Sequence, residues 1–215
     1  MPPFFWVEIM KKTHLFLEKP HTLLEPIELD GKTITQVVIK PWTAKSNIKL
    51  LPKGDALTFG ESCAFITAST GLTQEEIEEL VTQDYNSIFS DVHDYYRKTG
   101  YEMADNRTDE EKYEESQERE RAKKAGELHE PSQYEQDATQ SRVVLFFSGD
   151  RVVNLKRPKI KITKMAEEYD TIIEQRIFIL TQISGLSQAE VEDLPLPDYR
   201  SLNEVVMHFL SSKAA

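Results

Sequence analysis

The chain has 215 residues, of which 39% are apolar, and this length permits one large domain or two small ones. Its net charge of −11 argues against a general nucleic-acid-binding protein, which needs a basic face to displace counterions. The sequence contains no run of 18 or more apolar residues, so no membrane span is predicted. Its single cysteine, Cys63, excludes an intrachain disulfide framework and suits a reducing compartment.

Residues 1–22 form an N-terminal segment that opens with MPPFFWVEI. This stretch is apolar but short, and it lacks the basic start of a signal peptide. Two interpretations of Phe4, Phe5 and Trp6 stay open: they dock on a groove of this chain or a neighbouring one, or they form a disordered start.

Residues 23–100 are predicted to form a first folded unit. The run LLEPIELDGKTITQVVIKP has two β-prone halves around Asp30-Gly31, which favours a hairpin with a type I′ turn. A helix over 56–70 follows, with Phe59, Cys63 and Ile66 on one face, and Cys63 is interpreted as a small buried hydrophobic residue.

Three signals then delimit two further helices in this unit. Gly71 ends the first helix, because glycine adopts the left-handed C′ conformation at little cost. Thr73 and Glu76 form a capping box for a short helix. Asp84 is predicted to be the N-cap of a third helix over about 85–98.

Residues 101–141 are predicted to be an acidic linker, disordered or part helical. The segment has 13 acids against 6 bases and almost no aliphatic side chains, so it cannot bury a core. Thr108 with Glu111 could cap a solvated helix, the pair Glu120 and Lys124 could support it, and Gly126 could end it.

Residues 142–215 are predicted to form a second unit of the same design. Ser148-Gly149-Asp150 marks the turn of a hairpin, and a helix over 165–183 follows. Ten residues after the hairpins recur at a constant offset of 114. They are Gly71, Leu72, Gln74, Glu76, Glu78, Leu80, Asp84, Tyr85, Ser87 and Val92, matched by Gly185, Leu186, Gln188, Glu190, Glu192, Leu194, Asp198, Tyr199, Ser201 and Val206.

The fold class is therefore α+β, with two homologous small units, each a β-hairpin followed by three helices, joined by a charged linker. The repeated residues are helix stops and caps, which indicates a duplicated scaffold. We expect the two units to act as separate modules on a flexible tether.

No pattern of residues supports a catalytic, metal or cofactor site, and the chain is predicted not to be an enzyme. The five histidines are scattered, the near match to a nucleophile elbow at residues 60–64 lies in a helical pattern, and no glycine-rich phosphate loop occurs. The run FITASTGLTQEEIEELV has a helix-turn-helix outline, but its second helix is acidic where a DNA reader needs basic or amide side chains.

The combination of motifs resembles the tail assembly chaperones of contractile-tailed phages, the gpE-like and Mu gp41-like proteins, in two tandem copies. The resemblance is carried in the first unit by the opening phrase EPIELDGK and by TGL, followed by an acidic short helix and Asp-Tyr-x-x-Ile. The second unit keeps the later phrase, as SGL and Pro-Asp-Tyr, but lacks the opening one. Members of the family are usually a single unit.

The resemblance implies a non-catalytic chaperone that binds the phage tape measure protein and helps recruit tail tube subunits. It implies action in the cytoplasm of the infected host and absence from the mature virion. Partner-binding candidates are Phe89, Tyr95, Tyr96 and Phe209, and a place in the core is the alternative for most of them. Self-association is a further candidate interaction, and neither a membrane nor a nucleic acid is expected as partner. The alternatives are a helix-turn-helix-like regulatory protein and a structural phage tail protein.

Overall fold

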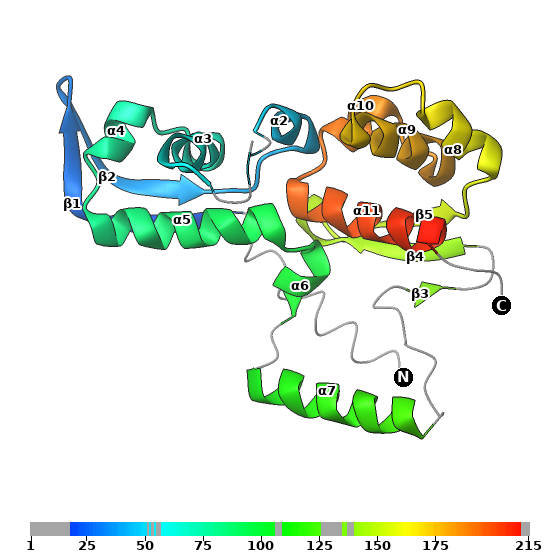
Figure 1. Ribbon diagram of the computed structural model, residues 1–215. Helices are drawn as coiled ribbons and strands as arrows, with labels where there is room; N and C mark the ends of the chain where they lie inside the picture. Colours follow the sequence, from blue (N-terminus) through cyan, green and yellow to red (C-terminus); the bar gives the residue numbers. More distant parts are fainter. Residues whose placement is uncertain are drawn as a thin grey trace.

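The computed structural model describes residues 18–50, 52, 54, 57–105, 109–125, 135–136 and 140–211. Within these ranges the chain folds into two units, each a β-hairpin followed by helices, and the predicted α+β class is confirmed. Figure 1 shows the two units side by side and helix α7 set apart from both. The residues Phe4, Phe5, Trp6, Thr108 and Gly126, which the sequence analysis singled out, lie outside the described residues.

The first unit begins with strands β1 (Lys19–Leu29) and β2 (Lys32–Ile39), which pair antiparallel. The predicted type I′ turn between them is confirmed, because Asp30 and Gly31 both have positive φ, of 50° and 75°. The register shifts between Thr22 and Ile27, so the middle of the hairpin is irregular, whereas Ile27–Leu29 pair in register with Lys32–Ile34 beside the turn. Four helices follow: α2 (Ala44–Lys49), α3 (Phe59–Thr70), α4 (Gln74–Glu78) and α5 (Thr82–Arg97).

The second unit repeats this order. Strands β4 (Gln140–Leu145) and β5 (Arg151–Lys156) form its hairpin, the short strand β3 (Glu135–Gln136) pairs with β4, and the one-turn helix η2 (Phe146–Ser148) precedes the turn. Its helices are α8 (Ile160–Ala166), α9 (Ile172–Ser184), α10 (Gln188–Glu192) and α11 (Leu196–Ser211).

Each unit has one more helix than predicted over the described residues. In the first unit the additional helix is α2, which follows the hairpin directly. In the second unit a single helix was predicted over 165–183, but the additional helix α8 begins earlier, at Ile160, and ends at Ala166, and α9 begins only at Ile172. The break occurs because Thr171 and Glu174 form a capping box, so a new helix begins where the apolar spacing alone predicts continuity.

The predicted glycine helix stops and the two predicted capping boxes are confirmed in both units. Gly71 and Gly185 end α3 and α9 with φ of 80° and 75°, which only glycine adopts at little cost. The capping boxes Thr73–Glu76 and Ser187–Glu190 begin α4 and α10. The hydrogen bond from the Ser187 backbone, with further bonds from Arg151 and the Ser187 side chain, lowers the pKa of Glu190 to about 2.

Buried apolar side chains of both units form one continuous core. Cys63 is buried, as predicted, together with Phe65 and Ile66 on α3, but Phe59 at the start of this helix is 54% exposed and does not join them. Each hairpin pairs only with strands of its own unit. The units thus keep separate folds but pack against each other, which corrects the expectation of independent modules on a flexible tether.

The predicted linker contains two helices. Helix α6 (Gly100–Ala104) follows α5 closely and packs against α11 of the second unit. Helix α7 (Asp109–Lys124) is highly charged, and the predicted pair Glu120–Lys124 forms an ion pair of 3.7 Å. The domain boundaries within this stretch stay predictions. None of the described helices is long and apolar enough to span a bilayer.

Candidate partner-binding surfaces

Asp84 and Asp198 occupy equivalent places in the two units, and both side chains are buried. The prediction that they are N-caps is wrong. Asp84 lies in the first turn of α5, whose N-cap residue is Val81, and Asp198 lies in the first turn of α11. Each carboxylate instead accepts hydrogen bonds from the hairpin of its own unit, and so fixes that hairpin to the last long helix.

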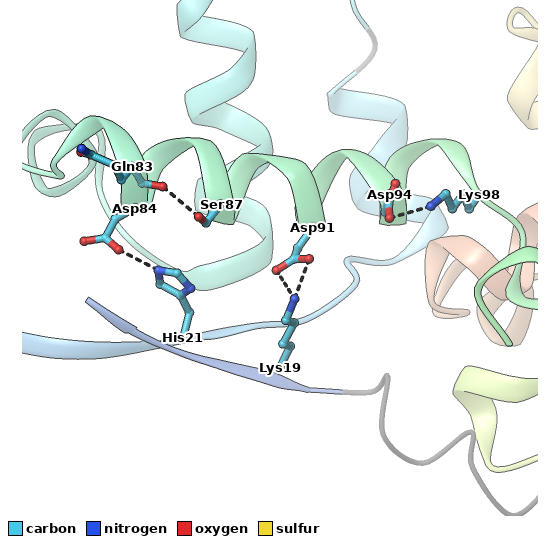
Figure 2. A network of polar contacts seen from close by, with 8 residues as sticks. All are labelled: Lys19, His21, Gln83, Asp84, Ser87, Asp91, Asp94 and Lys98. Atoms are coloured by element: carbon cyan, nitrogen blue, oxygen red, sulfur yellow. Dashed lines mark hydrogen bonds and ion pairs between the residues drawn. The ribbon is translucent and has the colours of Figure 1, made fainter. Parts of the chain in front are cut away.

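In the first unit the carboxylate of Asp84 binds strand β1. Its Oδ2 accepts from the backbone N–H of Leu24 at 2.8 Å, and its Oδ1 lies 2.9 Å from Nε2 of His21. Two turns along α5, Asp91 forms a 2.8 Å ion pair with Nζ of Lys19. Figure 2 shows both contacts between α5 and β1. They hold the hairpin along the length of the helix.

In the second unit the carboxyl of Asp198 binds η2. Its Oδ1 accepts from the backbone N–H of Phe147 at 3.1 Å, and its Oδ2 accepts from Oγ of Ser148 at 2.6 Å. Burial raises the pKa of Asp198 to about 7, although the hydrogen bonds from Ser148 and Phe147 act in the opposite direction. These hydrogen bonds fix η2 to the first turn of α11.

The two units meet first through their backbones. The N–H of Ala44, at the start of α2, donates to the carbonyl of Leu194 at 2.9 Å. The N–H of Leu196, at the start of α11, donates to the carbonyl of Trp42 at 2.8 Å. Lys45 and Glu192 form a 3.1 Å ion pair beside this bridge. The start of α2 is thus paired with the loop between α10 and α11.

Helix α6 provides the second contact between the units. The N–H of Gly100 donates to Oγ of Ser201 on α11 at 3.0 Å, and a Cβ at this glycine would lie 3.0 Å from Oδ1 of Asp198. Tyr101 accepts a 2.7 Å hydrogen bond at its hydroxyl from the N–H of Val144, on β4. Glycine at position 100 therefore allows the close approach of α6 to the second unit.

Three of the four predicted partner-binding residues are engaged within the chain. Tyr95 is 3% exposed and packs edge-on against Phe147. Tyr96 stacks on Phe65, and the guanidinium of Arg200 lies 5.1 Å from its ring centre. Phe209 is 9% exposed and is covered by Arg157. Tyr95 and Tyr96 thus contribute to the contact between the units.

The fourth candidate, Phe89, belongs to a row of partly exposed aromatic rings on the first unit. Phe59 stacks on Tyr85 with ring centres 5.8 Å apart, Tyr85 stacks on Phe89 at 6.0 Å, and Phe89 contacts His93 at 5.8 Å. We call these four residues the aromatic row. Tyr85, Phe89 and His93 are spaced four residues apart on one face of α5, and Phe59 extends the row onto α3.

The second unit does not repeat the aromatic row. At the offset of 114 its positions are occupied by Ile173, Tyr199, Asn203 and Met207. Of these, Tyr199 is 5% exposed, so its ring is not available at the surface. The aromatic row is therefore a property of the first unit and not of the duplicated scaffold.

Chemistry other than binding has little support among the described residues. No group of three or more histidine, cysteine, aspartate or glutamate side chains there could hold a metal ion. Burial, with the negative charge of Glu78, raises the pKa of the Cys63 thiol, which keeps it protonated and poorly nucleophilic.

Comparison with known proteins identifies the family. A family model described as "Phage tail assembly chaperone proteins, E, or 41 or 14" matches residues 20–92 and, a second time, residues 127–211. The chain belongs to this phage tail assembly chaperone family. The two matches correspond to the two units, as the resemblance of the motifs implied. No curated protein and no solved structure gives a significant match to the chain.

The bounds of the two family matches show which parts of the aromatic row, the buried aspartates and the helices α6 and α7 belong to a chaperone unit. Phe59, Tyr85 and Phe89 lie inside the first match, and Asp84 and Asp198 each lie inside one. Helices α6 and α7 lie between the matches. The aromatic row is thus carried mainly by a chaperone unit, whereas α6 is additional to both units.

Of the four residues of the aromatic row, only Phe89 was predicted from the sequence to bind a partner. The signal for Tyr85 and His93 was present, since residues four apart share a helix face, but Asp84-Tyr85 was interpreted as a repeated structural motif. The signal for Phe59 was misleading, because its spacing to Cys63 and Ile66 suggested a buried side chain.

Proposed function

We propose that this member of the phage tail assembly chaperone family binds the tape measure protein through the aromatic row of its first unit, without catalysis. The chaperone binds the tape measure protein before the tail tube forms around it and helps recruit tube subunits. It acts in the cytoplasm of the infected host and is absent from the mature virion. The observation that carries the proposal is the double match to the chaperone family.

The aromatic row supplies a surface of the right chemistry for an apolar helical client. Apolar helices bind grooves and faces through side chains at positions i, i+3, i+4 and i+7. Aromatic rings dominate such interfaces because they bury large areas with few rotatable bonds. The four rings of the row contact one another in sequence, so they are held in place before a client binds.

The charge of the chain fits the same role. With a net charge of −11, the exterior keeps a complex soluble while the client's apolar face is covered. The helix-turn-helix alternative finds little support, because its second helix, α4, has five residues and exposes Glu75 and Glu78. Such a helix would repel the phosphates of DNA.

The proposal predicts that the chain keeps a tape measure fragment soluble when the two are co-expressed. In a variant with Phe59→Ala and Phe89→Ala, the affinity for the fragment should fall about tenfold or more, since truncated interface anchors commonly cost 1–2 kcal/mol each. The measurement is the soluble fraction of the fragment, followed by titration calorimetry with the purified chain.

Tyr113→Ala is the matched control, because Tyr113 is 65% exposed on α7 and lies outside the row. A fragment that precipitates equally with and without the chain contradicts the chaperone function. A fragment that is kept soluble equally by the wild type and the row variant contradicts the assignment of the row alone. Mass spectrometry of purified virions tests the remaining alternative, since a structural tail protein would be abundant there.

A further inference from the structure

The contact between the two units is directional. The first unit contributes the start of α2, with the Trp42 carbonyl and the Ala44 N–H, and the second contributes the loop before α11, with the Leu194 carbonyl and the Leu196 N–H. In a symmetric pair, the start of α8 would contact the loop before α5 in the same way. No such contact occurs between the described residues of these two segments. The pairing is therefore head to tail.

Each half of this contact therefore has an equivalent segment elsewhere in the chain that makes no such contact. These two unused halves are the start of α8 and the junction between α4 and α5. Lys159, the N-cap of α8, corresponds to Thr43, the N-cap of α2, so Lys161 corresponds to Lys45. At the offset of 114, Glu78 corresponds to Glu192. Lys45 and Glu192 form an ion pair across the contact between the units. The residues at the equivalent positions, Lys161 and Glu78, also have opposite charges, but they do not form an ion pair with each other within the chain.

The exposure of these counterparts agrees with an unfilled contact. Ile160 is 86% exposed, whereas the equivalent Ala44, covered by the second unit, is 1% exposed. Lys161 and Glu78 are both exposed. Figure 1 shows α8 near one end of the molecule and α4 near the other, so the two unused halves cannot meet in one chain.

The charges on the two unused halves are complementary. The segment at and before α8 carries Lys156, Arg157, Lys159, Lys161 and Lys164. Helix α4 and its C-cap carry Glu75, Glu76, Glu78 and Glu79. Opposite charges at matched surfaces steer association and set its orientation.

We propose that a second copy of this chain binds head to tail, with the start of α8 of one copy against the α4–α5 junction of the next. The junction repeats the pairing that joins the two units within the chain. Because the two faces differ, repeated association produces an open array or a ring and not a closed dimer. This self-association does not depend on a client.

The association is weaker than the contact within the chain. Inside the chain, α6 adds the bonds of Gly100 to Ser201 and of Tyr101 to Val144, and the proposed junction between α8 and the α4–α5 segment does not include these bonds. The ion pair is exposed, so it contributes little and is screened by salt. Assembly should therefore rise with protein concentration and fall with ionic strength.

Sedimentation velocity of the full chain, over a concentration series at low and high salt, tests the proposal. The wild type should form dimers and larger species at low salt. Lys161→Glu and Glu78→Lys should each raise the dissociation constant about tenfold, because each places like charges at the junction. An equimolar mixture of the two variants should regain association, since both of its junctions then join opposite charges.

Lys124→Glu and Glu118→Lys, both on α7, make the same changes in net charge away from the junction and should leave association unchanged. Thermal unfolding of each variant checks that the fold is intact. The proposal is overturned if the wild type stays monomeric at all concentrations, if the junction variants associate like the α7 controls, or if their mixture fails to regain association. None of these outcomes bears on client binding, so the proposed function is tested separately.

Discussion

At the scale of single residues, an aspartate that recurs in both units was expected to cap a helix, but it links the last long helix of its unit to the hairpin. Asp84 and Asp198 sit where an N-cap signal is expected, but Val81 holds the cap position of α5. The carboxylates bind groups on the hairpins, which lie about 50 to 60 residues away in the chain. Such a link is tertiary structure, and its failure would loosen a hairpin without unwinding the helix.

The raised pKa of Asp198 predicts a specific pH dependence of stability. Because the pKa in the folded state is about 7, above that of an unfolded aspartate, the folded state holds an extra proton between about pH 4 and pH 7. The protonated carboxyl therefore stabilises the folded state fully below about pH 4. This contribution to the free energy of unfolding decreases as the pH rises and is lost once the pH has passed about 7. Asp198→Asn, which cannot ionise, should therefore gain stability relative to the wild type over this range.

Urea unfolding of both proteins at intervals from pH 4 to pH 8 measures this difference. At about 1.4 kcal/mol per pKa unit, the relative gain has an upper bound of roughly 4 kcal/mol. Asparagine keeps an oxygen that can accept from the Phe147 N–H, so the fold should persist. A stability difference that stays flat from pH 4 to pH 8 would show that the carboxyl is not titrating there.

At the scale of the elements, short helices depend on their caps. Helix α4 has five residues, too few to be stable alone, and its start is fixed by the reciprocal bonds of Thr73 and Glu76. The same device begins α3, α6, α9 and α10. The caps explain why the repeat is visible in the sequence, since the chemistry of a helix start is local.

Thr73→Ala should lower the free energy of unfolding by about 1 kcal/mol, because it removes the acceptor for the Glu76 N–H. Thr67→Ala is the matched control, since Thr67 is exposed within α3 and alanine is the better helix former. Chemical denaturation compares the two variants. Equal stabilities would mean that the cap contributes nothing beyond helix propensity.

How far the sequence predicts this fold depends on the distance over which each interaction acts. The turn at Asp30-Gly31, the stops at Gly71 and Gly185 and the capping boxes of α4 and α10 were predicted because their determinants lie within a few residues. The break between α8 and α9 was missed, because apolar spacing continues across it. The partners of Asp84 and Asp198 were missed because they are distant in sequence.

The surfaces were less predictable than the fold. The contact between the units uses backbone groups of Leu194 and Leu196, which leave no trace in the residue types. Tyr95 and Phe209 were named because aromatic rings suit partner binding, but the same property suits a core, and both are buried. The family was predicted correctly because short motifs, and not surfaces, identify it.

At the scale of the whole molecule, docking of the units depends on the close approach of α6 to α11. Gly100 lies in the first turn of α6 without a positive φ, so only space, and not backbone strain, restricts this position. The nearest atom to an added Cβ belongs to Asp198, whose carboxyl is held by two hydrogen bonds and cannot move freely. Crowding here would therefore act on the contact between units.

Gly100→Ala should lower the free energy of unfolding by about 1–3 kcal/mol, the usual cost of overpacking. Gly60→Ala is the matched control, because Gly60 lies in α3 with no atom within 4 Å of an added Cβ, so alanine should be neutral or stabilising there. Thermal unfolding monitored by calorimetry distinguishes them. If Gly100→Ala is as stable as Gly60→Ala, the approach of α6 tolerates a methyl group.

The absence of the aromatic row from the second unit has a consequence for comparing the two units of the chain. Phe89 is aromatic where Asn203 is not, while Gly71 and Gly185 are alike. Each unit can thus serve as a control for the other, because both share the helix stops and capping boxes but only the first carries the aromatic row.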